Sequence, residues 1–211
     1  MTEDLLRKLI AQYRVPEHIL AHMKKVSAVT LYIGQKLKGK GEKIDLIKLR
    51  QAALLHDTLK LCDFKELDLH PFRQNVTAED IHFWNALIKS CHKEGHIMAI
   101  YNVLKEIHED EIAEIILKHR FNCIIEKDNR PRTWEEKVLY YADKRVRFDK
   151  IVSIAQRLRD GKKRYFPDGK LSPTDKLVVN AIHRLEIEIC RKAGIRPEEI
   201  NDKNIAVYIE P

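Results

Sequence analysis

Six side chains that can bind metal ions lie where the predicted helices of this chain turn a face inward. They are His22, His56, Asp57, His96, His119 and Asp143. His56 and Asp57 are neighbours in one segment, and each of the other four lies in a helix-forming segment of its own. Inward-facing helix positions normally carry Leu, Ile or Val, because burying an unpaired His or Asp costs several kcal/mol. Six such groups that can converge in one interior indicate a shared partner, and a metal ion is the simplest one. The fold therefore has to bring these segments together.

The composition favours an all-α fold. The 211 residues include only seven Gly and seven Pro, whereas Leu, Ile, Lys and Glu are abundant, and such a balance predicts mostly helical structure. A hydrophobic content of 44% is sufficient for one good core with an appendage. The net charge of +7 arises from 39 basic and 32 acidic residues, so it is a general bias. It can attract phosphate groups or simply keep a lysine-rich surface soluble.

The cysteines and the N-terminal sequence are typical of a cytoplasmic protein. The four cysteines, at positions 62, 91, 123 and 190, form no CxxC pair, which favours reduced thiols over a zinc ribbon or a thioredoxin-type site. The chain starts with the acidic sequence Met1-Thr2-Glu3-Asp4, unlike a signal peptide. No apolar run approaches the ~18 residues that a membrane span requires, and we expect no contact with a membrane.

Hydrophobic periodicity predicts a series of helices with short connections. We expect helices over residues 3–12, 17–38, 45–59, 78 to just before 95, 96–107, 110–119, 133 to beyond 146, 150–159 and 174–193. Asp45, Thr77 and Thr133 occupy the expected N-cap positions. Residues 161–173, rich in Gly, Pro and Lys, indicate an exposed loop, and residues 205–209 indicate a single short strand. The expected division is a metal-binding domain over 1–160 and a helical extension over 161–211.

The ligand types define the chemistry of the expected site. Imidazole and carboxylate groups suit first-row metals such as Fe, Mn, Co or Zn. His56 and Asp57 are neighbours, so they point about 100° apart on a helix and can address adjacent metal positions, or Asp57 can bridge both. Two cations ~3.5–4 Å apart can polarise a phosphoryl oxygen and lower the pKa of a bound water.

Four of these residues resemble the defining H…HD…D signature of the HD superfamily of metal-dependent phosphohydrolases. The resemblance covers roughly residues 15–160 and includes the sequences around each position, which are His22-Met23-Lys24-Lys25-Val26, Ala52-Ala53-Leu54-Leu55-His56-Asp57-Thr58-Leu59-Lys60 and Tyr141-Ala142-Asp143-Lys144. His96 and His119 fall where dinuclear members carry two further histidines. The resemblance implies an HD-type helical bundle with two divalent cations. Fe or Mn would be preferred, with Co, Zn, Ni or Mg as alternatives.

The resemblance also implies roles for single residues. His22, His56, Asp57 and Asp143 would hold the first metal, and Asp57 would bridge to a second one held by His96 and His119. Members of the family often have Ile-Gly-Lys after the doublet, whereas this chain has Thr58-Leu59-Lys60, so the small residue is missing but the lysine is kept.

Three basic residues are candidates for binding the phosphate groups of a substrate. Lys60 shares a helix face with His56 and Asp57 if the helix continues, although a solvated lysine at a helix end is the simpler interpretation. Arg145 and Arg147 flank the last ligand, but Arg147 could equally form an ordinary ion pair with Asp143 four residues earlier.

Other histidines are weaker ligand candidates. His92 precedes His96 by four residues, so it is the substitute ligand if His96 does not reach the site. His18 has the same spacing to His22 but lies near a helix start, where partial exposure or a place at the site rim is expected.

Three functions are compatible with these patterns. The leading one is hydrolysis of a phosphate ester or anhydride, such as that of a nucleotide, through attack by a metal-bridging hydroxide, with Asp57 and Lys60 as the catalytic residues. The second is hydrolysis of dinucleoside polyphosphates such as diadenosine tetraphosphate. The third, from another class, is a non-catalytic nucleic-acid-binding or regulatory module, which the basic charge and Lys162-Lys163-Arg164 motivate. The oligomeric state is left open by the sequence.

Overall fold

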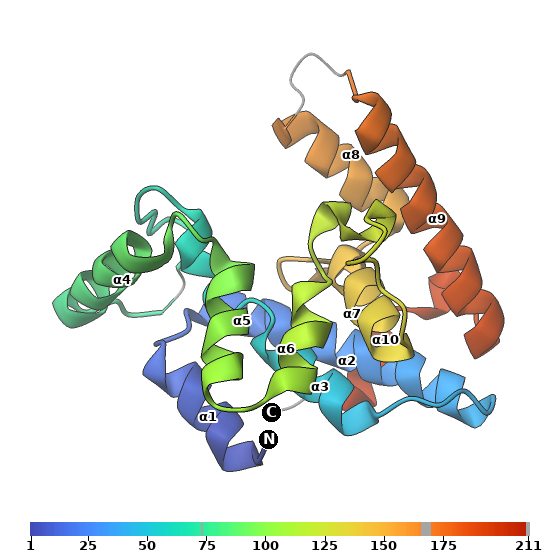
Figure 1. Ribbon diagram of the computed structural model, residues 1–211, viewed down its shortest axis with the longest axis horizontal. Helices are drawn as coiled ribbons and strands as arrows, with labels where there is room; N and C mark the ends of the chain where they lie inside the picture. Colours follow the sequence, from blue (N-terminus) through green and yellow to red (C-terminus); the bar gives the residue numbers. More distant parts are fainter. Residues whose placement is uncertain (73, 166–169, 210–211) are drawn as a thin grey trace.

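The computed structural model describes residues 1–72, 74–165 and 170–209, and in these ranges the protein is a bundle of helices with one small hairpin (Figure 1). This confirms the all-α fold. The elements follow one another as α1 (Glu3–Gln12), α2 (Glu17–Gly39), α3 (Leu46–Leu55), η1 (Lys60–Asp63), α4 (Ala78–Cys91), α5 (His96–Glu106), α6 (Asp110–Leu117), η2 (Phe121–Ile125), α7 (Trp134–Arg145), β1 (Val146–Arg147), β2 (Lys150–Ile151), α8 (Ile154–Tyr165), α9 (Pro173–Ala193), η3 (Pro197–Glu199), α10 (Asp202–Ile205) and η4 (Ala206–Tyr208).

The helix starts follow the expected capping residues. Asp45 accepts hydrogen bonds from the main-chain N–H groups of Ile47 and Lys48, both at 3.0 Å, so it caps α3. Thr77 and Thr133 each form a capping box with the acid three residues later, at the starts of α4 and α7. These caps satisfy main-chain donors that have no partner inside the helix.

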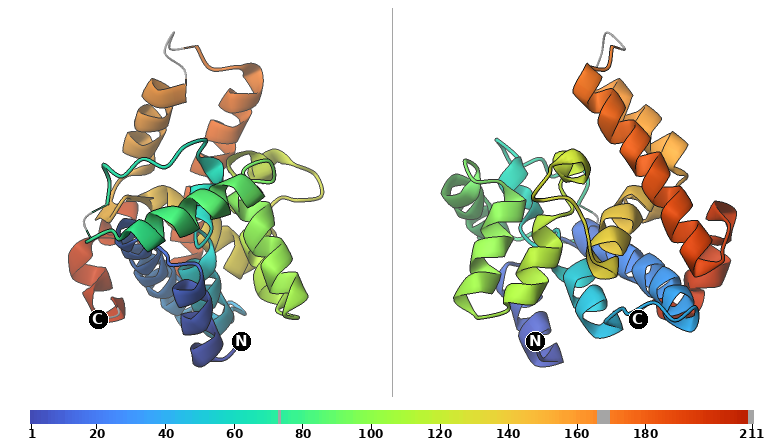
Figure 2. Two further views of the ribbon diagram at one scale, coloured as in Figure 1. Left: turned by 90° about the vertical axis from the view of Figure 1, so that its left-hand side faces the viewer. Right: turned by 45° about the vertical axis from the view of Figure 1, so that its right-hand side comes forward.

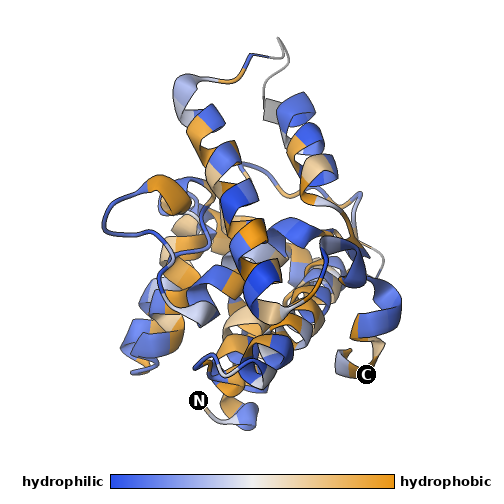
Figure 3. Cartoon of the chain, turned by 90° about the vertical axis from the view of Figure 1, so that its right-hand side faces the viewer, coloured by the Kyte–Doolittle hydropathy of each residue, from blue (hydrophilic) through white to orange (hydrophobic). Residues whose placement is uncertain are grey.

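Helix α2 is the central element of the bundle. It packs against α3, α7 and α9, and its side chains Val26, Val29 and Ile33 are fully buried. Helices α5 and α6 pack side by side beyond α3, whereas α8 and the first half of α9 extend away from the rest of the molecule (Figures 1 and 2). Helix α9 carries both apolar and hydrophilic residues along its length (Figure 3). Val178, Ile182 and Ile189 are buried, whereas Leu177 and Ile187 are exposed. Among the described residues, no helix combines the length and apolar character that crossing a bilayer requires.

Two helices end earlier than predicted, both next to expected ligands. Helix α3 ends at Leu55 rather than near residue 59, because the chain continues in tighter turns in which Thr58 N–H donates to Leu55 O and Lys60 N–H to Asp57 O. Helix α7 ends at Arg145 rather than beyond residue 146, because Val146 and Arg147 pair with β2 in an antiparallel hairpin.

Two expectations for the C-terminal part were wrong. Residues 150–153 form β2 and a short connection, so α8 starts at Ile154, and it extends to Tyr165 into the expected loop 161–173; residues 166–169 of that loop lie outside the described residues. The expected strand 205–209 is absent, because Ile205 ends α10 and Ala206–Tyr208 form a 3₁₀ turn. A strand needs a neighbouring strand to satisfy its main-chain groups, and β1 and β2 pair only with each other among the described residues.

The cysteines also differ from the expectation of reduced thiols. Cys62 in η1 and Cys91 at the end of α4 form a disulfide that closes a loop between positions 29 residues apart. Cys123 and Cys190 are free and buried. Since the sequence-based argument for a reducing compartment used the cysteines, the disulfide removes that argument.

Reducing this disulfide should lower the free energy of unfolding by about 3–4 kcal/mol, because a loop of this length gains that much chain entropy in the unfolded state when it is opened. Urea denaturation of the wild type with and without a phosphine reductant measures the difference. The Cys62→Ser/Cys91→Ser double variant is the control and should not respond to the reductant. A wild type of equal stability in both conditions would contradict the prediction.

Candidate metal centre

All six predicted ligand residues lie together where α2, α3, α6 and α7 meet, with α5 at the side (Figure 1). Helix α2 supplies His22, the turn after α3 supplies His56 and Asp57, and His96 is the first residue of α5. His119 follows the end of α6 by two residues, and Asp143 lies in the last turn of α7. Their ligand atoms form two groups, each within 4.8 Å: His22, His56 and Asp143, and Asp57, His96 and His119.

Asp57 lies between the two groups and presents one oxygen to each. Its Oδ2 atom is 3.8 Å from the Nε2 atoms of both His22 and His56. Its Oδ1 atom is 3.0 Å from His96 Nε2 and 3.9 Å from His119 Nε2. This arrangement is possible because His56 and Asp57 follow directly from the buried end of α3 into a tight turn. A carboxylate in this position can serve two cations at once.

The four imidazole rings are oriented in the same sense, with Nε2 toward the cluster and Nδ1 toward an acceptor outside it. Three of the Nδ1 atoms face main-chain carbonyl oxygens, at 2.8 Å from His22 to Phe148, 2.8 Å from His56 to Ala53 and 2.5 Å from His119 to Ile116. A carbonyl oxygen can only accept, so these Nδ1 atoms carry a proton, and when the ring is neutral its Nε2 atom keeps a lone pair for a metal.

The surroundings of the His56 ring indicate whether a cation fits between the ligand residues. Its Nε2 atom is fully buried and has no hydrogen-bond partner among the described residues, although carboxylate oxygens of Asp57 and Asp143 lie 3.8 and 3.9 Å away. A buried nitrogen lone pair without a donor is costly. A cation placed among these atoms would satisfy the nitrogen and both carboxylates, so the donor set fits a metal.

Asp57, Asp143 and His119 have the protonation states that metal binding requires. Burial alone raises the pKa values of Asp57 and Asp143, but Lys60 and Lys144, with the neighbouring histidines, hold both values well below normal. Burial, together with the charges of nearby histidines, keeps the pKa of His119 well below its usual value. The two aspartates are therefore ionised, and His119 is neutral, as ligation requires.

Burial lowers the pKa values of His22 and His96, but hydrogen bonds to carboxylates outweigh it and raise both values. The carboxylate is that of Asp143 for His22, and those of Asp57 and Asp63 for His96. Metal binding at these two rings therefore competes with protonation.

Lys60 and Asp63, from η1, border the second group of ligands. Lys60 Nζ is 3.5 Å from Asp57 Oδ1 and 3.3 Å from Asp63 Oδ2, and about a third of its side chain is exposed. Burial lowers the pKa of Lys60, but the charges of Asp57, Asp63 and Asp143 outweigh it and raise the value, so the ammonium group stays charged. Lys60 is thus a cation at the border between the ligand cluster and solvent.

Arg145 does not reach the cluster. Its guanidinium group is buried and donates to the main-chain oxygens of Val152, Pro197 and Ile200 and to the Tyr141 hydroxyl, so the expected role in phosphate binding is corrected to a structural one.

Arg147 follows α7 on β1, where its ion pair is with Asp160 of α8 at 2.8 Å, and not with Asp143. Its side chain is 43% exposed, and it is next to Phe148, whose carbonyl accepts from His22. The guanidinium is therefore partly open to solvent and directed at α8, while only the main chain of the next residue contacts a ligand residue.

The remaining histidine candidates lie outside the cluster. His92 is the C-cap residue of α4, and its Nδ1 atom lies 3.3 Å from Cys62 O, so it is not among the clustered residues, whereas His96 is. His18 is partly buried and packs against the ring of Phe72.

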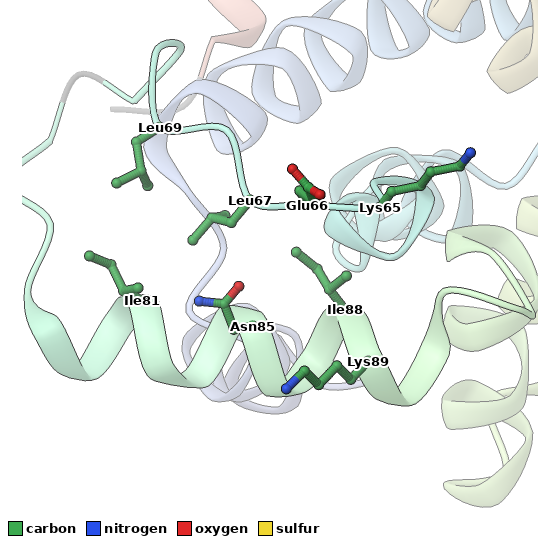
Figure 4. Close-up of a pocket in the computed structure, with 8 residues that line it drawn as sticks. All are labelled: Lys65, Glu66, Leu67, Leu69, Ile81, Asn85, Ile88 and Lys89. Carbon is green, nitrogen blue, oxygen red and sulfur yellow. The ribbon is translucent and has the colours of Figure 1, made fainter.

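A hollow of about 410 Å³ lies apart from the ligand cluster, between Leu67 and Leu69 on one side and α4 on the other (Figure 4). None of the six ligand residues lines it.

Sequence reasoning missed two residues around the cluster, Asp63 and Lys144. Asp63 was missed because the chain leaves the helix at His56, so helical spacing does not relate Asp63 to the ligands. It could have been found from its position three residues after Lys60, because residues three apart in a 3₁₀ turn have their side chains on the same side. Lys144 is buried, and its ammonium group donates to His119 O at 2.9 Å and to Asp143 Oδ2 at 3.2 Å. A lysine beside a predicted ligand in a buried helix is the signal in that case.

Replacing Lys144 with Met should lower the free energy of unfolding of the metal-free protein by about 3 kcal/mol, because Asp143 would lose its cation while remaining buried. Saturating Mn²⁺ should stabilise this variant more than it stabilises the wild type, since the metal supplies the missing charge. Urea denaturation in chelator and in Mn²⁺ provides both comparisons.

The control for this prediction is Lys137→Met on the same helix. Lys137 pairs with the partly exposed Glu188 and should contribute about 1 kcal/mol or less. A Lys144→Met variant as stable as this control would show that the Lys144–Asp143 pair is not important for the fold.

Comparison with protein-family models gives one finding on identity. The model of the HD domain matches residues 19–147, a range that contains all six clustered residues. Searches of curated proteins and of solved structures gave no match. The HD domain is the fold of a superfamily of metal-dependent phosphohydrolases, and the paired His and Asp groups fit a metal site. Because the match spans more than half of the chain, this protein belongs to the HD domain family.

Proposed function

We propose that this protein is a phosphohydrolase that uses two divalent cations to cleave a small phosphate ester or anhydride, with nucleotides as the substrate class. The single observation that carries the proposal is the convergence of four imidazole Nε2 atoms and two carboxylates in one buried cluster, with Asp57 facing both halves. A scaffold without turnover has no need for this set of buried ionisable groups, which are expensive to bury.

The ligand assignment that we propose follows the two groups. His22, His56 and Asp143 would hold one cation, His96 and His119 the other, and Asp57 would contact both. Imidazole and carboxylate ligands favour Fe or Mn, while Co, Zn, Ni and Mg are alternatives. When bound, such cations lower the pKa of water and polarise a phosphoryl oxygen.

Lys60 would act on the substrate. Its ammonium group is charged, borders the second ligand group and is partly open to solvent, the side from which a phosphate group arrives. It can donate a hydrogen bond to a phosphoryl oxygen and stabilise the negative charge that develops during cleavage. No side chain needs to act as nucleophile, because the water supplies that role.

Wild-type protein loaded with Mn²⁺ or Fe²⁺ should hydrolyse at least one member of a nucleotide panel, and Asp57→Asn should lower kcat about a thousandfold, corresponding to ~4 kcal/mol of lost transition-state stabilisation. Phosphate release measures both. Asp68→Asn is the control, because Asp68 is exposed and only caps a loop at His70. An inactive wild type, or an Asp57→Asn variant as active as the control, would contradict the proposal.

Lys60→Met should reduce kcat/KM about 10- to 100-fold, as expected for one charge-assisted hydrogen bond of roughly 1.5–3 kcal/mol. At saturating Mn²⁺ its metal content should equal that of the wild type, so the lower kcat/KM would not come from loss of metal. Unchanged kinetics on the preferred substrate would assign Lys60 a purely structural role.

Dinucleoside polyphosphates are a second candidate substrate, because a longer chain of phosphates could reach basic residues beyond the ligand cluster. Arg147 lies on the strand next to Phe148, and its partner helix α8 carries the further basic residues Arg157, Arg159, Lys162 and Lys163. Rates on a mononucleotide and on diadenosine tetraphosphate distinguish the two substrates.

Binding of RNA that weakens steeply with salt, without turnover, would support the nucleic-acid-binding alternative instead.

A further inference from the structure

One imidazole of the cluster has a different partner from the other three. His22, His56 and His119 direct Nδ1 at neutral carbonyl oxygens. His96 directs Nδ1 at a carboxylate, with 2.7 Å between His96 Nδ1 and Asp63 Oδ2. A charged acceptor makes a stronger hydrogen bond and increases the electron donation of the opposite ring nitrogen. His96 Nε2 is that nitrogen, and it faces Asp57.

The same carboxylate also fixes the main chain of His96. Asp63 Oδ1 accepts a hydrogen bond from the His96 N–H at 3.1 Å, at the first residue of α5. The N-cap residue is Gly95, which has no side chain to cap the helix and adopts a φ of +79°. Asp63 therefore caps α5 from another element, and a single side chain sets both where α5 begins and how its first ring is turned.

Asp63 is itself held in place from two directions. Lys60 Nζ lies 3.3 Å from Asp63 Oδ2, which puts this lysine between Asp63 and Asp57. The preceding residue, Cys62, is joined to Cys91, four residues before Gly95, so η1 is fixed next to the turn that leads into α5. The position of the carboxylate relative to His96 is therefore determined by covalent and ionic contacts.

From these contacts we infer that Asp63 is a positioning residue that makes His96 a stronger ligand than the other three histidines and thereby sets the affinity of the cation held by Asp57, His96 and His119. This inference rests on the two-cation site proposed above. The two ligand groups then differ in the residues that hold them from outside. In the group of His22, His56 and Asp143, the histidines contact main-chain carbonyl oxygens and the aspartate contacts Lys144, whereas in the other group His96 contacts the carboxylate of Asp63.

The Asp63→Asn variant tests the inference, because an amide oxygen keeps the shape of the acceptor and removes its charge. In titrations of metal-free protein with Mn²⁺, followed by calorimetry, wild type should bind two equivalents. The variant should bind one equivalent as wild type does and the other about 10- to 100-fold more weakly. Absorption spectra with Co²⁺ should show the same loss. Asp68→Asn, a loop carboxylate that also accepts from a histidine, should match the wild type.

Two further variants separate positioning through His96 from a merely structural effect. In the His96→Ala background the sensitive equivalent should be lost, and adding Asp63→Asn should change the remaining affinity no further. If adding Asp63→Asn weakens the remaining equivalent in the His96→Ala background, then Asp63 acts on the cluster by a route other than His96 and the inference is overturned.

The outcomes also separate this inference from the proposed function. Equal Mn²⁺ affinities in wild type and Asp63→Asn, or a wild type that binds fewer than two equivalents, would overturn the role of Asp63 even if hydrolysis is observed. A wild type that binds two equivalents, loses one selectively in Asp63→Asn and hydrolyses none of the nucleotides would refute the proposed function and support the role of Asp63.

Discussion

The structure depends on how it compensates the charge of two carboxylates that are largely withdrawn from water. Asp57 is buried and the Asp143 side chain is 15% exposed, and an isolated carboxylate in such a place would be protonated more readily than in water. Each has a lysine beside it, Lys60 for Asp57 and Lys144 for Asp143, and each faces the nitrogen atoms of histidine rings. These contacts offset the cost of placing the two carboxylates between the helices. The same arrangement directs the imidazole Nε2 atoms and the carboxylate oxygens toward one another, where a cation could bind them.

Much of the site could be predicted because its residues break the pattern around them. A histidine in the apolar stripe of α2 and a His-Asp pair at the end of the apolar segment of α3 are conspicuous against Leu, Ile and Val. Their convergence follows from helical periodicity and from the resemblance to the HD superfamily. Caps were predictable for the same reason, since Asp45, Thr77 and Thr133 act on main-chain groups within their own segment.

What the sequence could not predict depends on contacts between distant segments. The end of α3 at Leu55 and the 3₁₀ turn that follows determine that Asp63 meets His96, and no local propensity specifies that pair. Arg145 has the charge of a phosphate ligand, but its surroundings are set by residues some fifty positions later in the chain. The Cys62–Cys91 bond was missed because two cysteines 29 residues apart give no information on pairing until the fold brings α4 next to η1.

Arg145 links the last ligand helix to the C-terminal segment. It is two residues from Asp143, and its guanidinium group donates to main-chain oxygens of Pro197 and Ile200. A buried guanidinium cannot give up its proton, so it needs those acceptors for α7 to keep its place. Residues near 200 therefore contact the helix that carries Asp143, and any partner that pulls the C-terminal segment away would act mechanically on that helix.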